Sequence, residues 1–335
     1  MKIIGTGSAL PKKVVTNDML SEFLDTSDEW IVPRTGIRSR HIITDEKIED
    51  LGAKAALSAL EMSGLKPEEI DYCICSNVVS EYVTPGLGCV IGAKIGLKCP
   101  CVDINCACPG FIYALDIAET HYLAGKAKNV LIICAEQPSR MCDWSDRSTC
   151  VLFGDGAGAV VLGNDEPPGV ASLKTKAHTL LGADGNGAEF IKREGGCRKA
   201  LPIDPKTGVP MKGSPILAEL TLQGHDVFAF AVRTLSKVSR DLCTLLGTTP
   251  EELDRVFAHQ ANGRIIEAVA RRMKLPLEKF WLNLETTANT SAASIPISLD
   301  QAVRAGELKE GMKIVMVGFG AGLTYAGTYC TWPNL

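Results

Sequence analysis

Cys108 is the residue of this sequence best placed for covalent chemistry. It stands between an apolar, strand-like segment at residues 102–105 and a segment at residues 110–123 with helical apolar spacing. Proline is favoured at the first position of a helix, so Pro109 makes Cys108 the predicted N-cap residue, with its sulfur at the positive end of the helix dipole. That position lowers the pKa of a thiol and favours the nucleophilic thiolate. Most cysteines are inert apolar residues, so a nucleophile here needs partners elsewhere in the chain.

Neighbouring cysteines offer two alternatives. Cys106 is only two residues away, but it falls at the end of the predicted strand, outside the helix dipole. A zinc cluster could use Cys99, Cys101, Cys106 and Cys108. Because each pair is separated by one residue, rather than the about two to four residues common in zinc sites, we expect no metal.

Two polar residues could assist a thiol nucleophile. His259 ends a predicted strand at residues 255–258 and precedes a predicted helix at residues 263–273, and strand ends are where α/β sites form. Asn289 lies in a loop of small and polar residues ahead of an apolar helix. Taken alone, the histidine could be structural or solvated, and the asparagine could be a loop or capping residue.

Two glycine-rich runs, residues 154–158 and 318–322, could be mistaken for nucleotide-binding loops. Each is followed by a strand-like segment rather than a helix, so the context of a dinucleotide site is missing. We therefore read both runs as tight turns and expect no flavin or nicotinamide cofactor.

Strand-like and helix-like segments alternate along the chain, which predicts an α/β protein. Predicted strands are residues 70–76, 102–105, 130–135, 255–258, 313–317 and 323–328. Predicted helices are residues 48–62, 110–123, 222–246 and 263–273. We expect two similar α/β halves, residues 1–165 with Cys108 and residues 166–335 with His259 and Asn289. A glycine-rich excursion at about residues 181–215 is predicted to be a functional cover or loop.

The composition of the chain is typical of a globular protein. The 335 residues are 46% apolar and 22% charged, with a net charge of −4, so a globular protein that binds neither nucleic acid nor an anionic membrane is expected. No segment reaches the roughly 20 apolar residues of a membrane span, and no signal peptide is recognised. We expect a cytoplasmic protein whose 13 cysteines are reduced.

Together these segments resemble the β-ketoacyl-acyl-carrier-protein synthase III family of thiolase-like condensing enzymes. The similarity spans nearly the whole chain and rests on the order and spacing of several motifs. They are Gly5-Thr6-Gly7-Ser8, Asp25-Thr26-Ser27-Asp28-Glu29-Trp30-Ile31, Arg34-Thr35-Gly36-Ile37, Cys108-Pro109-Gly110-Phe111, Gly154-Asp155-Gly156-Ala157-Gly158, His259-Gln260-Ala261-Asn262 and Asn289-Thr290-Ser291-Ala292-Ala293-Ser294. The resemblance implies a duplicated, five-layered αβαβα thiolase fold, a homodimer, and Cys108 rather than Cys106 as the nucleophile.

The resemblance also implies a reaction that starts fatty acid biosynthesis. Cys108 would accept an acyl group from acyl-CoA, with its own N–H and that of Ala321 stabilising the oxyanion. His259 and Asn289 would bind the thioester oxygen of malonyl-acyl-carrier protein during loss of CO₂. The resulting carbanion would attack the acyl group to give a 3-oxoacyl product, with no metal or redox cofactor.

Further roles follow from the same resemblance. Trp30 and Arg147 would hold the CoA adenine, and Arg34, Gly224 and Phe228 would line the pantetheine tunnel. Arg264, Arg271 and Arg272 would form a basic patch for acidic acyl-carrier protein. Ordinary packing or solvated charge is the alternative for each of these residues.

Three features depart from the family pattern. The glycine-rich excursion is longer than usual, Thr84 stands where a phenylalanine often limits acyl length across the dimer, and Ala321 replaces a glycine. A related enzyme of secondary metabolism, which makes a polyketide starter, a quinolone or an ester, would use the same Cys108, His259 and Asn289. A noncatalytic scaffold with this fold is a further alternative, which the intact set of three residues disfavours.

Overall fold

The computed structural model describes residues 1–164, 179–193 and 220–335. Within the predicted excursion at about residues 181–215, the part from residue 194 onward lies outside the described residues. The predicted division at residue 165 also adjoins an undescribed segment and stays a prediction.

The first sheet is built from the first half of the chain. Its strands lie in the order β1 (Lys2–Ala9), β7 (Gly156–Gly163), β6 (Val130–Glu136), β4 (Tyr72–Ser76) and β5 (Cys101–Ile104). β4 runs parallel to β5 and β6, whereas β7 is antiparallel to β1 and β6. β6 and β7 are buried along their whole length, as expected for apolar strands covered on both faces.

The second sheet is built from the second half. Its order is β11 (Arg255–Ala258), β12 (Lys313–Gly320), β13 (Thr324–Thr331) and β8 (Thr179–Ala183). β11 is parallel to β12, and β13 is antiparallel to β12 and β8. β11 and β12 therefore end at the same edge of the sheet, where His259 follows β11.

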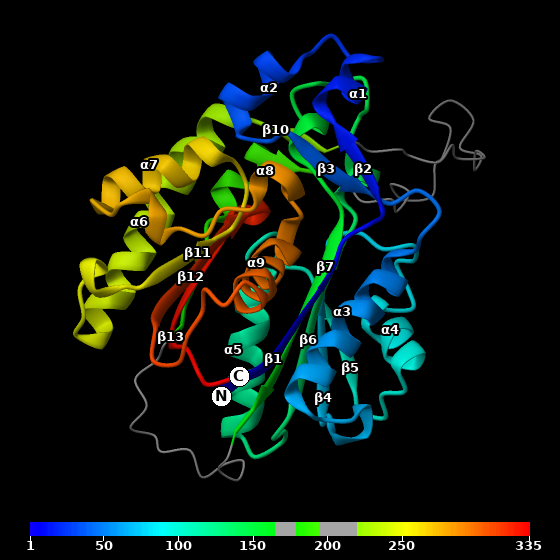
Figure 1. Ribbon diagram of the computed structural model, residues 1–335, viewed down its shortest axis with the longest axis vertical. Coiled ribbons are helices and arrows are strands. Elements are labelled where there is room, and N and C mark those ends of the chain that lie inside the picture. Colours follow the sequence, from blue (N-terminus) through cyan, green and yellow to red (C-terminus); the bar gives the residue numbers. More distant parts are fainter. Residues whose placement is uncertain (165–178, 194–219) are drawn as a thin grey trace, which may run out of the picture.

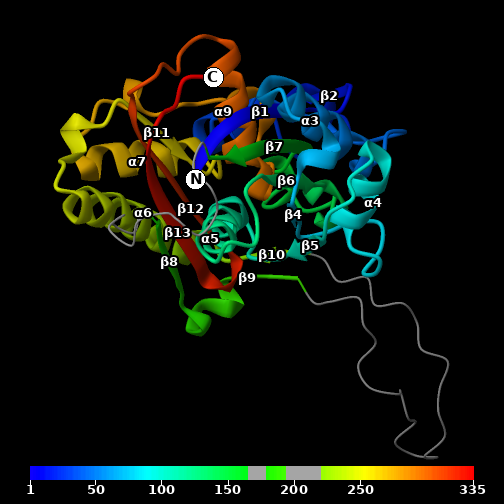
Figure 2. The ribbon, with the colours of Figure 1, turned by 90° about the horizontal axis from the view of Figure 1, so that it is seen from below.

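Helices cover both sheets and fill the space between them. α3 (Ile48–Ser63) and α4 (Leu87–Ile95) lie outside the first sheet, and α6 (Gly224–Leu246) and α7 (Gly263–Met273) lie outside the second (Figures 1 and 2). The central layer consists of α5 (Gly110–Leu123) and α9 (Ser294–Arg304), which share one apolar core with both sheets. The predicted five-layered αβαβα fold is confirmed.

Smaller elements complete the described part of the chain. They are α1 (Asn17–Ser21), α2 (Asp28–Thr35), α8 (Leu284–Thr287), the pair β2 (Lys13–Thr16) and β3 (Ser39–Ile42), and the pair β9 (Ile191–Lys192) and β10 (Thr221–Leu222). No helix among the described residues combines the length and the apolar character needed to cross a membrane.

Candidate active site

A cavity of about 810 Å³ brings residues from both halves together. Cys108, His259 and Asn289 all line it and form what we call its inner end. Trp30, Arg34 and Arg147 line its more exposed part, here called the outer end. The structure thus brings together three side chains that lie up to 181 residues apart in the sequence.

Cys108 lies in a tight turn between β5 and α5. Ala107 has a φ of 53°, and Gly110 N–H donates to Ala107 O at 3.0 Å. The N-cap of α5 is Pro109, whose carbonyl accepts from Ile112 N at 2.9 Å. The prediction of Cys108 as the N-cap residue was therefore wrong by one position, because the turn closes before the helix begins.

Burial controls the acidity of the Cys108 thiol. It raises the pKa of Cys108 to about 12; the Ser291 hydroxyl lowers this pKa, and the buried carboxyl of Glu136 raises it. The expected lowering of the Cys108 pKa is therefore wrong for this structure, because the loss of solvation outweighs the hydrogen bonds that lower the pKa. Cys108 is a thiol here, and it must lose its proton when it attacks a thioester.

His259 is held as a neutral imidazole directly after β11. Its side chain is buried, and burial lowers its pKa to about 3. Nδ1 lies 2.7 Å from Ser294 Oγ, which also accepts from Gln260 N–H at 3.4 Å. When the Ser294 hydroxyl donates its hydrogen to Nδ1, the ring hydrogen is on Nε2. Nε2 can then donate a hydrogen bond.

Asn289 is fixed by both its backbone and its side chain. Its N–H donates to Leu152 O at 2.9 Å, and its carbonyl accepts from Gly154 N–H at 3.1 Å. Its side-chain Oδ1 accepts from Ser291 N–H at 2.8 Å. With the oxygen engaged, the Nδ2 hydrogens remain as the donors of this amide.

The end of β12 packs closely against the Cys108 turn. A Cβ atom added to Gly320 would lie 2.7 Å from the Cys108 nitrogen, so only glycine permits this approach. Ala321 follows at once and lines the same cavity. The Gly320 backbone, one residue before Ala321, therefore lies beside that of Cys108.

The outer end is built around the Trp30 ring. The guanidinium carbons of Arg34 and Arg147 each lie 4.7 Å from its centroid. Arg34 Nη1 donates to Trp30 O at 3.0 Å, and Arg147 Nη1 lies 3.2 Å from Asp25 Oδ2. Cationic groups stacked on an indole suit a planar ligand with negative charges.

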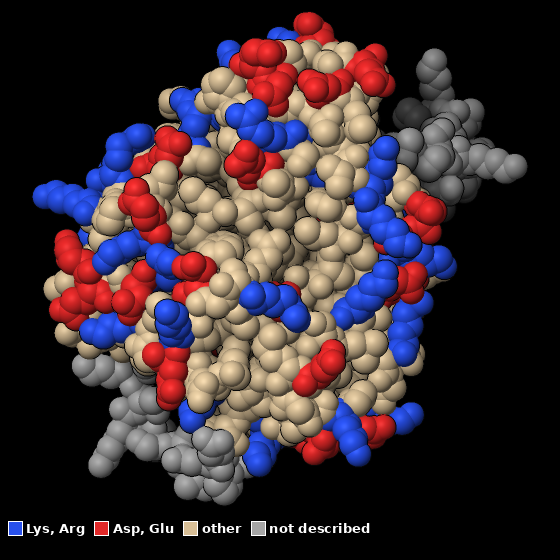
Figure 3. All heavy atoms as spheres, in the orientation of Figure 1, with Lys and Arg blue, Asp and Glu red and all other residues tan. Residues whose placement is uncertain are grey.

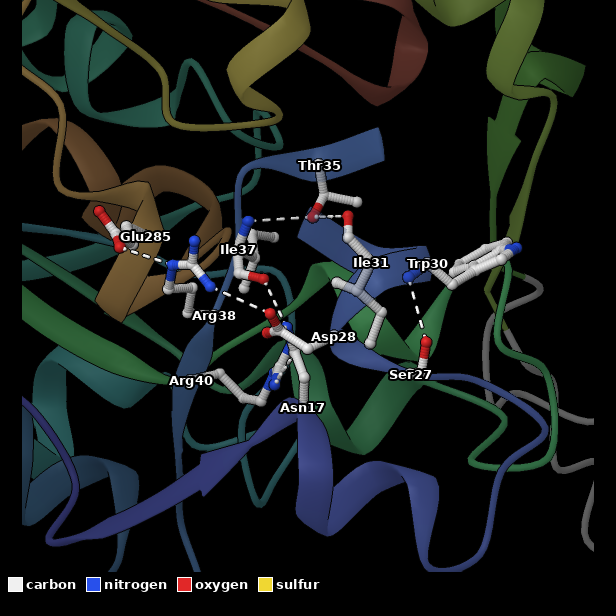
Figure 4. Close-up of polar contacts among 10 residues, drawn as sticks. All are labelled: Asn17, Ser27, Asp28, Trp30, Ile31, Thr35, Ile37, Arg38, Arg40 and Glu285. Carbon is white, nitrogen blue, oxygen red and sulfur yellow. Dashed lines mark hydrogen bonds and ion pairs between the residues drawn. The ribbon is translucent and has the colours of Figure 1, made fainter. Parts of the chain in front are cut away.

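A buried polar network holds α2, and with it Trp30, in place (Figure 4). Arg40 is fully buried and donates to Asn17 Oδ1 at 2.8 Å and to Val151 O at 3.0 Å. Asn17 Nδ2 in turn donates to Asp28 Oδ1, at the start of α2, at 2.8 Å. Val151 directly precedes Leu152, whose carbonyl accepts from Asn289 N–H. Arg40 therefore supports both ends of the cavity, the outer end through Asn17 and the inner end through Val151.

Comparisons with known proteins agree with this geometry. The model of 3-oxoacyl-[acyl-carrier-protein (ACP)] synthase III matches residues 102–185, and the model of its C-terminal part matches residues 243–332. A β-ketoacyl-[acyl-carrier-protein] synthase III from Clostridium acetobutylicum is 42% identical over 335 residues, covering 100% of this chain and 99% of the relative. The chain belongs to the 3-oxoacyl-[acyl-carrier-protein] synthase III family.

Two solved structures share this fold over nearly the whole chain. The enzyme from Aquifex aeolicus is 40% identical, with a TM-score of 0.86 and 99% of each chain covered. The priming β-ketosynthase of the R1128 polyketide pathway is 34% identical, with a TM-score of 0.87, covering 99% of this chain and 96% of that one.

The other residues predicted to bind substrates in this synthase III family member lie in the cavity or on α7. Gly224 and Phe228 line the cavity, and Arg264 lies 6.0 Å from the Phe228 ring. Arg264, Arg271 and Arg272 are exposed on α7, where Arg271 Nη1 lies 3.9 Å from Glu267 Oε2. Basic and acidic side chains are mixed on this side of the molecule (Figure 3).

Thr84 lies outside the cavity of a single chain. It belongs to the exposed segment of residues 81–85 and is absent from the cavity lining. Its predicted role against the acyl chain therefore depends on a second copy. Within the described ranges, no three or more His, Cys, Asp or Glu side chains are grouped so that they could hold a metal ion.

Three supporting residues were not assigned roles from the sequence. Ser291 and Ser294 lie in the Asn289 motif, where small polar residues are typical of any loop. Glu136 ends the apolar run of β6 and is fully buried. A charged residue that directly continues a buried strand is the signal that could have identified Glu136.

Proposed function

We propose that this protein joins an acyl-CoA primer to malonyl-acyl-carrier protein by decarboxylative Claisen condensation, giving the 3-oxoacyl-carrier protein that starts fatty acid synthesis. The observation that carries this proposal is the meeting of Cys108, His259 and Asn289 in one cavity. A thiol nucleophile faces a space that two neutral hydrogen-bond donors also reach, and this is the set of groups that the reaction needs.

The first half-reaction is acyl transfer to Cys108. The Cys108 thiol gives up its proton to solvent as the sulfur attacks the thioester carbonyl, the C–S bond to CoA breaks, and CoA leaves as a thiolate that takes a proton back from solvent. The N–H groups of Cys108 and Ala321 stabilise the negative oxygen of the tetrahedral intermediate. The closeness of these two backbone segments at Gly320 supports this role.

The second half-reaction is decarboxylation and carbon–carbon bond formation. His259 Nε2 and Asn289 Nδ2 donate hydrogen bonds to the malonyl thioester oxygen, and loss of CO₂ leaves an enolate. Because burial keeps His259 neutral, it contributes a hydrogen bond rather than a full charge. The enolate carbon then attacks the acyl group and expels Cys108 as a thiolate.

Substrate contacts follow from the cavity lining. Trp30, Arg34 and Arg147 would bind the nucleotide end of CoA, and Gly224 and Phe228 the pantetheine arm. The exposed arginines of α7, Arg264, Arg271 and Arg272, would contact the acidic carrier protein. No metal or cofactor is required, because decarboxylation itself drives the condensation.

Two further properties stay predictions. A homodimer is one of them: among the described residues β5 is an edge strand of the first sheet, and an edge strand can pair with a second copy. A cytoplasmic location rests on the sequence alone.

The test is a condensation assay with a panel of acyl-CoAs and malonyl-acyl-carrier protein, with products identified by mass spectrometry. Wild type and Cys106→Ala should form 3-oxoacyl-carrier protein, and Cys108→Ala should not. Strong preference for an unusual primer would favour a role in secondary metabolism. Activity that survives in Cys108→Ala would contradict the proposal, and an inactive wild type would favour a noncatalytic scaffold.

A further inference from the structure

The neutral imidazole of His259 can carry its ring hydrogen on either nitrogen, and the proposed reaction needs it on Nε2. With the hydrogen on Nδ1, Nε2 would be an acceptor and could not bind the malonyl thioester oxygen. In a buried neutral histidine, the group that faces one ring nitrogen decides which nitrogen carries the hydrogen. The partner of Nδ1 therefore matters for the chemistry at the other side of the ring.

Ser294 Oγ is the group that faces Nδ1. The two atoms lie 2.7 Å apart, and both side chains are buried. Oγ also accepts from Gln260 N–H at 3.4 Å. Among the described residues, the Ser294 hydroxyl forms only these two hydrogen bonds, and the imidazole forms only the one with Ser294.

The two tautomers of His259 differ in what becomes of the serine hydrogen. If Nδ1 carries the ring hydrogen, Ser294 Oγ must accept from both Nδ1 and Gln260 N–H, and its own hydrogen has no acceptor among the described residues. If Ser294 donates to Nδ1, the serine hydrogen and the Nδ1 lone pair are both satisfied. Because a buried donor without an acceptor is destabilising, this balance favours hydrogen on Nε2.

The segment that carries Ser294 also orients the second donor of the inner end. Ser294 N–H donates to Ser291 O where the short 3-10 helix Ser291–Ala293 meets α9. Ser291 N–H in turn donates to Asn289 Oδ1 at 2.8 Å. This segment thus occupies Oδ1 of Asn289 and Nδ1 of His259, and both side chains line the cavity with their remaining N–H groups unused.

We propose that Ser294 is a positioning residue for decarboxylation, which fixes the ring hydrogen of His259 on Nε2 by donating its hydroxyl hydrogen to Nδ1. Ser294 is absent from the cavity lining, so it acts through His259 rather than on the substrate. The inference rests on the proposed role of His259 as a hydrogen-bond donor to the malonyl thioester.

Ser294→Ala should slow malonyl decarboxylation about tenfold, which is the usual effect of losing one hydrogen bond. Without a donor at Nδ1, both tautomers are populated, and only the one with hydrogen on Nε2 stabilises the enolate. The loss should fall on kcat, with KM for malonyl-acyl-carrier protein changed less than about twofold, because the lost interaction is strongest in the transition state. Acylation of Cys108 should be unchanged, since it does not use His259.

The decisive experiment reads the tautomer of His259 by NMR, using protein with nitrogen-15-labelled histidine and no substrate. Signals that are missing in His259→Ala identify this ring. Wild type should carry the hydrogen on Nε2, and Ser294→Ala should show a mixture of the two forms. Ser298→Ala is the matched control, because Ser298 is also a buried serine of α9 outside the cavity lining. It should match wild type in both tautomer and rate, and thermal unfolding of each variant checks the fold.

A wild-type ring with its hydrogen on Nδ1 would overturn the inference, and this result does not depend on whether Ser294→Ala folds. A Ser294→Ala ring that keeps its hydrogen on Nε2 alone would also overturn it, as would a wild-type decarboxylation rate in that variant. The tautomer is read without substrate, so failure of the proposed function is separable. A wild type with hydrogen on Nε2 that releases no CO₂ from malonyl-acyl-carrier protein would contradict the proposed function and support the hydrogen bond from Ser294.

Discussion

The inner and outer ends of the cavity are built from different interactions. At the inner end, Cys108, His259 and Asn289 are held by backbone hydrogen bonds and packing, and burial shifts the pKa of Cys108 to about 12 and that of His259 to about 3. At the outer end, Arg147 and its partner Asp25 form an ion pair with side chains 41% and 102% exposed. Burial gives the inner end its chemistry, whereas the outer end relies on screened charges and stacking. Substitutions at the two ends should therefore have different effects.

The largest effect should come from removing the donors of the inner end. His259→Ala and Asn289→Ala should each slow malonyl decarboxylation by about 100- to 1000-fold, the usual cost of one donor to a developing oxyanion. Acylation of Cys108 should persist in both. The measurement is release of CO₂ from malonyl-acyl-carrier protein beside intact mass after acyl-CoA, and retained decarboxylation in both variants would contradict the roles assigned here.

Arg40 sharpens the comparison, because its contacts support both ends. Arg40→Met should lower the free energy of unfolding by about 3 kcal/mol, since it leaves buried acceptors such as Asn17 Oδ1 and Val151 O without a donor. The control is Arg38→Met, whose side chain is 55% exposed, and which should cost less than about 1 kcal/mol. Urea unfolding checks both values, and equal losses would refute the role of Arg40.

A smaller effect is expected at the outer end. Arg147→Ala should raise the KM for acyl-CoA by about fivefold, because it removes one stacking cation. Its malonyl decarboxylation rate should stay unchanged. Arg140→Ala is a suitable control, since Arg140 forms a comparably exposed ion pair with Glu81 but does not line the cavity. A loss of decarboxylation in Arg147→Ala would remove the distinction between the two ends.

The smallest expected effect is that of pH on the decarboxylation rate, because His259 should not titrate. Burial lowers the pKa of His259 to about 3, so the imidazole is neutral at any higher pH. Decarboxylation should therefore be constant between about pH 5 and about pH 7, where an ordinary histidine would titrate. A drop in rate toward pH 5 with a midpoint near 6.5, assigned to His259 by its NMR signals, would show that the side chain is accessible to protons.

Much of the fold could be predicted from periodicity. The predicted helices at residues 110–123 and 263–273 and the strand at residues 255–258 are confirmed with identical bounds. Local patterns define such elements well because each has its own apolar face. The apolar run at residues 130–135 was predicted as a strand, and β6 (Val130–Glu136) extends it by one residue.

The site was predicted less completely, for physical reasons. Cys108, His259 and Asn289 were identified, but the pKa of Cys108 was assigned the wrong direction, because desolvation depends on packing from distant segments. Ser294 was missed for the same reason: its contact with His259 forms only when the end of β11 meets the start of α9. Contacts between distant segments leave no spacing signal in a single sequence.

The most direct test of the central claim is intact-protein mass spectrometry after incubation with acyl-CoAs, comparing wild type, Cys106→Ala and Cys108→Ala. Wild type and Cys106→Ala should each gain the mass of one acyl group, and Cys108→Ala should gain none. A gain that persists in Cys108→Ala, or disappears only in Cys106→Ala, would contradict Cys108 as the acyl acceptor.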